Sequence, residues 1–92
     1  MKYTVIHTPE AEEHWAKHTK SGDKAIMRKI VRLLEEVEKH PRFGTGKPEQ
    51  LKYYEVETWS RRINDKHRMV YEIRDHIITI NVLSFWGHYE DK

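Results

Sequence analysis

The sequence WSRRINDKHRMVYEIR, residues 59–74, decides the fold, because two alternating runs flank a turn-forming segment. Alternation of apolar and polar residues is typical of β-strands with one buried face. Asn64-Asp65-Lys66 is the natural turn between the two runs. A three-residue loop would place Ile63 opposite His67 and Arg62 opposite Arg68. We therefore predict an antiparallel hairpin of residues 59–63 and 67–74. The residues predicted to face the core are Trp59, Arg61, Ile63, His67, Met69, Tyr71 and Ile73.

The opposite face of this hairpin would carry Arg62 and Arg68 side by side. Like charges directly opposite each other destabilise a sheet slightly. An anion between them would remove that cost, and the guanidinium fork suits phosphate oxygens. The alternative is a solvated face on which Glu72 supplies the counter-charge.

The segment before the hairpin predicts two helices. One apolar stripe runs from Ile26 to Val37, with Asp23 as N-cap, Lys39-His40 at the C-terminus and Pro41 as the stop signal. Thr8-Pro9 marks the start of an earlier helix, which fades near Lys20 and ends at Gly22. Its two histidines, His14 and His18, have a spacing that could hold a metal, but no third ligand follows. Exposed helix histidines are the preferred interpretation.

The remaining strands and loops complete the expected fold. Residues 2–7 read as a short strand, residues 41–50 as a loop, and residues 53–57 and 77–85 as strands. Residues 44–47, GTGK, lack the spacing of a phosphate-binding loop. The order predicts one α+β domain spanning residues 1–92, with two N-terminal helices packed on one face of a small antiparallel sheet.

Composition narrows the function classes. The chain has 92 residues, a net charge of +2 and no cysteine, which excludes disulfides and thiol catalysis. No apolar run is long enough for a membrane span or a secretory signal, so we expect a cytoplasmic protein without a membrane partner.

Several candidate residues would be unremarkable if they were considered singly. Glu49 would be an exposed loop carboxylate, Lys47 and Lys52 would be surface charges, and His88 would be a terminal residue. Their combination is specific, because five short motifs occur in one order. These are GKPE at residues 46–49, LK at 51–52, WSRRI at 59–63, HRMVY at 67–71 and HY at 88–89. With these motifs in this order, the whole chain resembles the YoeB/Txe family, whose members are RNA-cleaving relatives of RelE.

The resemblance implies the fold and the activity together. The fold would be RelE-like, and the protein would be the toxin of a type II toxin–antitoxin pair, a ribosome-dependent mRNA endonuclease without a cofactor or metal. Glu49 would be the general base, Arg68 a catalytic arginine, and His88 and Tyr89 the catalytic C-terminal pair. The basic positions around the RNA would be Lys47, Lys52, Arg61 and Arg62. The partners would be mRNA and rRNA on the ribosome and a cognate antitoxin, and a homodimer stays an alternative to a monomer.

The chemistry expected of these residues uses the RNA's own 2'-OH as nucleophile. A base, an acid and a cation for the charge that develops on the phosphate suffice. An imidazole is a natural acid, because its ordinary pKa lies near neutrality. Two alternatives remain from the sequence, a non-catalytic toxin on the same scaffold that acts on gyrase and an RNase that works without the ribosome.

Overall fold

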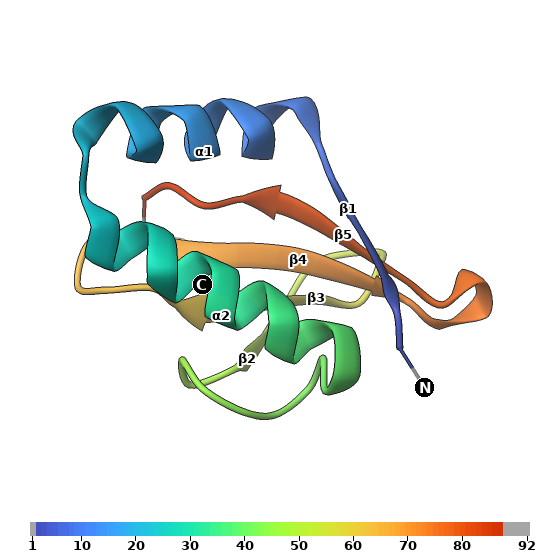
Figure 1. Ribbon diagram of the computed structural model, residues 1–92. Helices are drawn as coiled ribbons and strands as arrows, with labels where there is room; N and C mark the ends of the chain where they lie inside the picture. Colours follow the sequence, from blue (N-terminus) through green and yellow to red (C-terminus); the bar gives the residue numbers. More distant parts are fainter. Residues whose placement is uncertain (1, 88–92) are drawn as a thin grey trace.

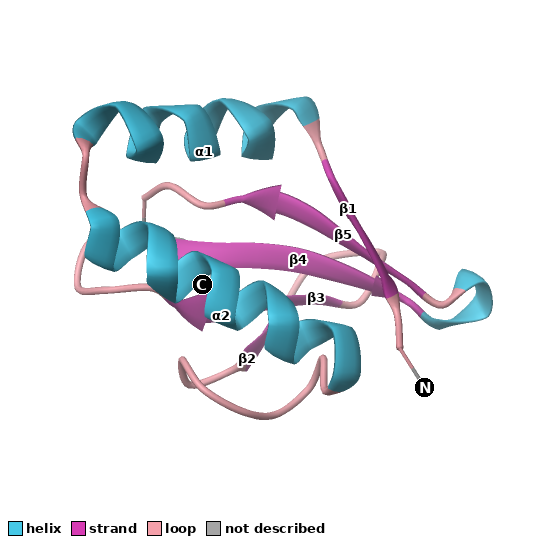
Figure 2. Cartoon of the chain, in the orientation of Figure 1, coloured by secondary structure: helices cyan, strands magenta, loops and turns pink. Residues whose placement is uncertain are grey.

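The computed structural model describes residues 2–87, in which two helices cover one face of a five-stranded sheet (Figures 1 and 2). The elements in chain order are β1 (Thr4–His7), α1 (Pro9–Ser21), α2 (Lys24–Lys39), β2 (Glu49–Leu51), β3 (Thr58–Arg62), β4 (Arg68–Arg74), a 3-10 turn (Asp75–Ile77) and β5 (Thr79–Ser84). The α+β class and the two helices on one face are as predicted.

Both helices begin and end close to the residues that the sequence indicates. The Thr8 hydroxyl accepts a hydrogen bond from the Ala11 amide at 3.1 Å, and Pro9 occupies the first position of α1. Gly22 ends α1 with φ 74°, a conformation that favours glycine. The Asp23 carboxylate caps α2 through the Ile26 amide at 3.1 Å.

The sheet has the order β1-β5-β4-β3-β2 and is mixed rather than antiparallel throughout. β1 pairs with β5 in parallel, so the prediction of a purely antiparallel sheet is wrong at this edge. The parallel pairing was missed because β1 pairs with a strand that lies more than 70 residues further along the chain. Local sequence patterns do not show which distant strand will be the partner.

The β3–β4 hairpin has the predicted register. Arg62 lies opposite Arg68, and the Ile63 amide donates to the His67 carbonyl oxygen at 3.0 Å. The Asn64 side-chain oxygen accepts from the amides of Lys66 and His67 at 2.9 and 2.8 Å, which closes the turn.

Two predicted strands differ from the structure. Residues 53–57 form no strand, because Tyr53 has φ 67° and is 83% exposed. The strand that pairs with β3 is instead β2, which overlaps the end of the predicted loop and extends one residue beyond it. The last strand starts at Thr79 rather than residue 77, because the turn Asp75–Ile77 and Ile78, with φ 48°, come first.

The core lies between the helices and the sheet. Ile30, Leu33 and Val37 of α2 are fully buried against it. Each such side chain contributes about 1.5–3 kcal/mol on burial, so the α2 stripe anchors this helix to the sheet. Within residues 2–87, no helix combines the length and apolar character needed to cross a membrane.

Candidate functional site

The sheet face away from the helices brings together three of the predicted site residues. Glu49 on β2 pairs with Ser60 on β3, and Ser60 pairs with Val70 on β4. Arg62 and Arg68 are two residues from Ser60 and Val70, and residues opposite or two apart share a face. Glu49, Arg62 and Arg68 therefore lie on one face of three adjacent strands.

The strand spacing sets the distance between the carboxylate and the arginines. Glu49 is two strands and two residues from Arg68, which corresponds to about 12 Å between their Cα atoms. Both side chains are long, so a phosphodiester could lie between them. A carboxylate can accept a proton there, and guanidinium groups can stabilise phosphate charge.

Glu49 owes its position to a close approach just before β2. The Gly46 carbonyl oxygen accepts from the Arg62 amide at 2.6 Å. Gly46 has φ 88°, and a Cβ at this position would lie 3.0 Å from the Arg62 carbonyl oxygen, so the site demands glycine. Lys47, also at positive φ (49°), then turns the chain into β2.

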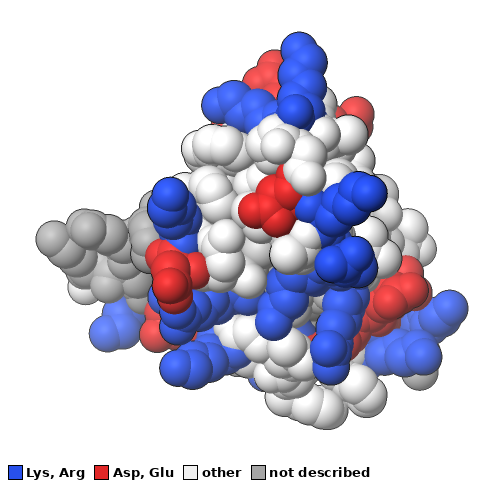
Figure 3. All heavy atoms as spheres, turned by 60° about the vertical axis from the view of Figure 1, so that its left-hand side comes forward, with Lys and Arg blue, Asp and Glu red and all other residues white. Residues whose placement is uncertain are grey.

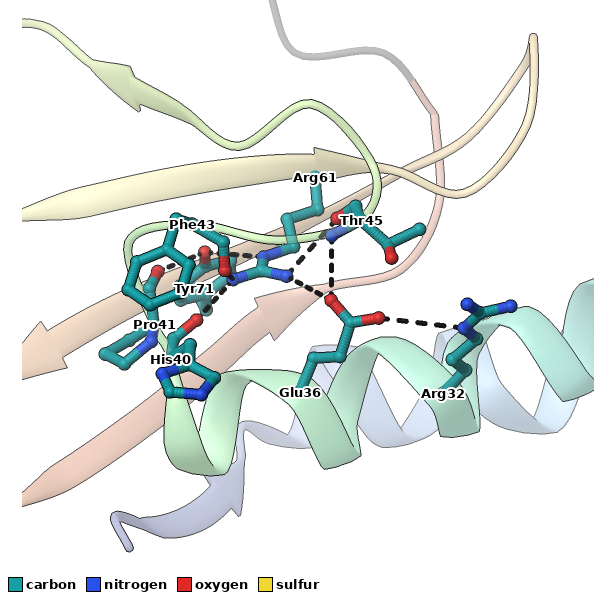
Figure 4. A network of polar contacts seen from close by, with 8 residues as sticks. All are labelled: Arg32, Glu36, His40, Pro41, Phe43, Thr45, Arg61 and Tyr71. Carbon is teal, nitrogen blue, oxygen red and sulfur yellow. Dashed lines mark hydrogen bonds and ion pairs between the residues drawn. The ribbon is translucent and has the colours of Figure 1, made fainter. Parts of the chain in front are cut away.

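Arg61 has a different environment from its neighbour Arg62. It points to the helix side and is fully buried (Figure 4). Nη2 donates to the carbonyl oxygens of His40 and Phe43 at 2.6 and 2.9 Å, and Nη1 donates to that of Thr45 at 3.2 Å. The predicted contact of Arg61 with RNA is at odds with this burial. The side chain instead joins β3 to the loop that leads to Glu49.

Two further groups complete the Arg61 network. Glu36 on α2 accepts from Nη1 of Arg61 at 3.1 Å and from the Thr45 amide at 2.8 Å. Burial alone would raise the pKa of Glu36, but the hydrogen bonds from Thr45 and the charge of Arg61 outweigh it and lower the pKa. Tyr71 accepts from Nε of Arg61 at 3.0 Å and donates to the Pro41 carbonyl oxygen at 2.7 Å.

The arginines on the open face differ in their partners. Arg62 forms an ion pair with Asp65 of the hairpin turn. Glu72, which we considered as the counter-charge for Arg62 and Arg68, instead forms an ion pair of 3.1 Å with Arg74 on its own strand. Among residues 2–87, the Arg68 guanidinium has no hydrogen-bond or ion-pair partner. As far as residues 2–87 are concerned, Arg68 is thus the arginine of this face whose guanidinium can receive an anion.

The remaining predicted site residues are partly described. Lys47 and Lys52 are exposed on either side of β2. His88 and Tyr89 lie outside the described residues. The segment before them is held on β4, because the Arg68 amide donates to the Gly87 carbonyl oxygen at 3.0 Å.

His14 and His18 are not exposed, and that interpretation is wrong. His18 is 1% exposed, and the side chain of His14 is 15% exposed. Both bind the backbone of Phe85 beyond β5. The signal was present in the sequence, since Ala11, Trp15 and His18 follow one another at steps of four and three. No group of three metal-binding side chains occurs in the described part of the chain.

One end of the molecule is rich in basic side chains. Figure 3 shows Lys and Arg gathered at the end formed by the α1–α2 turn and the β3–β4 hairpin, with fewer acidic side chains between them. The sequence supplies Lys17, Lys20 and Lys24 around that turn and Lys66 in the hairpin. The charge is thus placed for a polyanion although its total is small.

The chain is similar in sequence to known bacterial toxins. Residues 7–89 match the family model described as "YoeB-like toxin of bacterial type II toxin-antitoxin system". Toxin YoeB from Escherichia coli K12 is 39% identical over 72 residues, which cover 76% of this chain and 86% of that protein.

Solved structures give the same result. The YoeB dimer from Staphylococcus aureus has a TM-score of 0.81 and 34% identity, with 97% of this chain and 100% of that chain covered. The same organism's YoeB has been solved in a heterotetrameric complex with YefM, with a TM-score of 0.77. RelE in the RelE–RelB complex from Pyrococcus horikoshii shares the fold, with a TM-score of 0.73, 20% identity and coverage of 95% and 96%. The chain therefore belongs to the YoeB-like toxin family of bacterial type II toxin–antitoxin systems.

Proposed function

We propose that this toxin is a ribosome-dependent mRNA endonuclease that inhibits translation in the cytoplasm. The observation that carries the proposal is the common face of Glu49, Arg62 and Arg68, which combines a potential base with two phosphate-binding groups. Family membership supports it, since all three residues lie within the stretch 7–89 that matches the family model.

In the proposed reaction the 2'-OH next to the scissile phosphate is the nucleophile. Glu49 takes its proton as the O2'–P bond forms, and His88 gives a proton to O5' as the P–O5' bond breaks. The products are a 2',3'-cyclic phosphate and a 5'-OH. Arg68, with help from Arg62, stabilises the charge of the phosphorane, and Tyr89 assists beside His88. Side chains supply every group in this scheme, so it needs no metal or cofactor.

The proposed partners follow from the charge and from the relatives. A net charge of +2 holds free RNA weakly at physiological salt, which favours presentation of the codon by the ribosome. Lys47 and Lys52 beside β2 would contact mRNA or rRNA. By analogy with the S. aureus complex, an antitoxin would bind this toxin, and a homodimer is a second proposed assembly.

The test is cleavage of a programmed message on purified ribosomes, with mapping of the new 5' ends. Glu49→Gln and His88→Ala should slow cleavage at least a hundredfold, while the ribosome-bound fraction stays similar. Glu55→Gln is the matched control, because Glu55 is an exposed carboxylate in the next loop. Cleavage by Glu49→Gln at the wild-type rate would refute the role of Glu49.

A second arm tests the nucleophile and the target. A message with a 2'-deoxy nucleotide at the cut site should resist cleavage, and normal cleavage would refute the 2'-OH mechanism. Equal cleavage of naked RNA at moderate salt would point to a ribosome-independent RNase. Intact messages together with DNA breaks in cells would point to a gyrase-directed toxin.

A further inference from the structure

Three histidines bind the backbone that leads out of β5. Nδ1 of His14 accepts a hydrogen bond from the Phe85 amide at 3.2 Å, and Nε2 of His18 lies 2.9 Å from the Phe85 carbonyl oxygen. Nδ1 of His67 accepts from the Gly87 amide at 2.9 Å. We call these residues the histidine cluster. Two of them come from α1 and one lies just before β4, so the segment 85–87 is held from both sides.

The direction of each hydrogen bond fixes which ring nitrogen carries a proton. A backbone amide can only donate, so Nδ1 of His14 and Nδ1 of His67 must be unprotonated. Both rings are therefore neutral in this structure. His18 differs, because its partner is a carbonyl oxygen and Nε2 must donate. The His18 bond survives protonation of its ring, whereas the other two do not.

Ring packing and a second backbone bond hold the same segment. The Trp86 ring lies 4.8 Å from that of His18 and 4.4 Å from that of His67, centroid to centroid. Lys17 Nζ lies 4.8 Å from the Trp86 ring centroid. Gly87 is bound at both ends of its backbone, since its carbonyl oxygen accepts from the Arg68 amide at 3.0 Å.

This arrangement bears on the catalytic pair through chain connectivity. Consecutive Cα atoms are about 3.8 Å apart, so the position of Gly87 limits where His88 can lie. Gly87 is bound to Arg68, the proposed phosphate-binding arginine. Whatever fixes Gly87 beside β4 therefore fixes the residue that directly precedes His88 in the sequence.

We propose that His14 and His67 are positioning residues of this toxin, which as neutral imidazoles hold residues 85–87 beside Arg68 and release them when protonated. The proposal rests on the proposed function for its effect on cleavage, but the holding of the backbone is independent of it. The two histidines and His88 thus have opposite requirements. His88 must carry a proton to act as the acid, and His14 and His67 must carry none on Nδ1.

The surroundings of both rings bear on this requirement. Burial lowers the pKa of His14, which keeps the ring neutral at neutral pH. The charged or titratable groups near His14 are Glu10, Glu13, Lys17 and His18. A hollow of about 380 Å³ lies beside His67, and the charged or titratable groups that line it with His67 are His18, Asp23, Asp65 and Lys66. Acidification adds positive charge to a cluster that lies close to Lys17, and it turns two acceptors into donors that face amides.

The test uses asparagine, whose side-chain oxygen lies near the position of Nδ1 and does not titrate. The variants are His14→Asn with His67→Asn, His67→Leu, and the control His76→Asn, a histidine exposed in the Asp75–Ile77 turn. Hydrogen exchange of the Phe85 and Gly87 amides, corrected for intrinsic rates, is measured by NMR at pH 7.5 and 5.5. Cleavage on programmed ribosomes is measured at both pH values.

In the wild type and in His76→Asn, protection of both amides should fall about tenfold between pH 7.5 and 5.5. The double asparagine variant should keep its protection at both pH values and retain at least half of the wild-type cleavage at pH 7.5. His67→Leu should lose Gly87 protection at both pH values and cleave at least tenfold more slowly.

The proposal would be overturned if protection of the Phe85 and Gly87 amides in the wild type did not change with pH. It would also be overturned if a folded His67→Leu variant cleaved at the wild-type rate. If the toxin cleaves no RNA, the exchange measurements still decide whether the cluster holds the segment. If His67→Leu does not fold, the pH dependence of the wild type against the double asparagine variant decides it.

Discussion

Nη2 of Arg61 on β3 donates a hydrogen bond of 2.6 Å to the carbonyl oxygen of His40, the residue that ends α2. One buried guanidinium thus satisfies the end of a helix and ties the following loop to the sheet. That loop leads through Gly46 to Glu49, so Arg61 acts on the candidate site from the opposite side of the sheet. Arg62, the next residue, faces the site itself.

The first prediction separates these two arginines. Arg61→Lys keeps the charge but loses the planar fork, so it cannot reach the three carbonyl oxygens and Glu36 together. We expect it to lower the free energy of unfolding by about 3 kcal/mol and to slow cleavage by displacing Glu49. Urea denaturation and the ribosome assay measure both effects.

Arg62→Lys is the matched control for Arg61→Lys. The Arg62 side chain is 41% exposed, and its pair with Asp65 is a surface pair worth less than about 1 kcal/mol. The control should therefore unfold close to the wild-type urea concentration. Equal stability of the two variants would contradict the structural role of Arg61.

The second prediction concerns the close approach of Gly46 to β3. Gly46→Ala places a Cβ 3.0 Å from the Arg62 carbonyl oxygen at a positive φ. Gly22→Ala, also at positive φ, meets nothing within 4 Å. The control should cost about 1 kcal/mol of backbone strain, and Gly46→Ala about 1–3 kcal/mol more, because β2 must shift. Only Gly46→Ala should reduce cleavage, and equal losses in both variants would show that contact with β3 is irrelevant.

The hairpin was predictable because its determinants are local. Asn64 closes the turn with its own side chain, and alternation then fixes the pairing of Arg62 with Arg68. The three-residue strand β2 was not predictable, because it depends on the contact of Gly46 with β3, outside its own segment. Periodicity shows where a strand can form but not where an edge strand finds its partner.

The partners of Arg61 and of the two α1 histidines could not be predicted, for a related reason. The alternating pattern placed Arg61 on the core face, but a buried arginine is acceptable only with partners that the sequence does not reveal. Those partners are supplied by the end of α2 and its loop. His14 and His18 similarly depend on the backbone of Phe85, which lies about 70 residues away.

The third prediction is that acid weakens the fold through Glu36. Its pKa is lower in the folded protein than its ordinary value of 4.5, so the unfolded chain binds the proton more readily. Its contribution is complete above pH 4.5 and is lost as the pH falls through the folded pKa. Glu36→Gln should be less stable than the wild type at pH 7 and should lose less stability between pH 7 and pH 3.5.

The control for Glu36→Gln is Glu35→Gln, an exposed neighbour on the same helix. It should show the full wild-type loss of stability in acid. Glu57 and Asp75, whose pKa values are also lowered by hydrogen bonds, should leave some acid dependence in every variant. Unfolding midpoints in urea at the two pH values measure these differences, and an unchanged acid loss in Glu36→Gln would refute the prediction.

The fourth prediction concerns the two ends of β4. Among residues 2–87 the Arg68 guanidinium has no hydrogen-bond or ion-pair partner, whereas Arg74 on the same face is paired with Glu72 and bears on no part of the candidate site. If Arg68 binds a phosphate, its replacement removes one counterion-releasing contact. In a Glu49→Gln background, which prevents cleavage, Arg68→Ala should weaken binding to a single-stranded RNA. It should also lower the slope of log affinity against log salt by about 0.7.

Arg74→Ala is the control and should leave the slope unchanged, because the charge of Arg74 is already neutralised by Glu72. Equal slopes for the Arg68 and Arg74 variants would mean that affinity comes from the overall charge of the protein, and that the open face contributes no phosphate contact of its own.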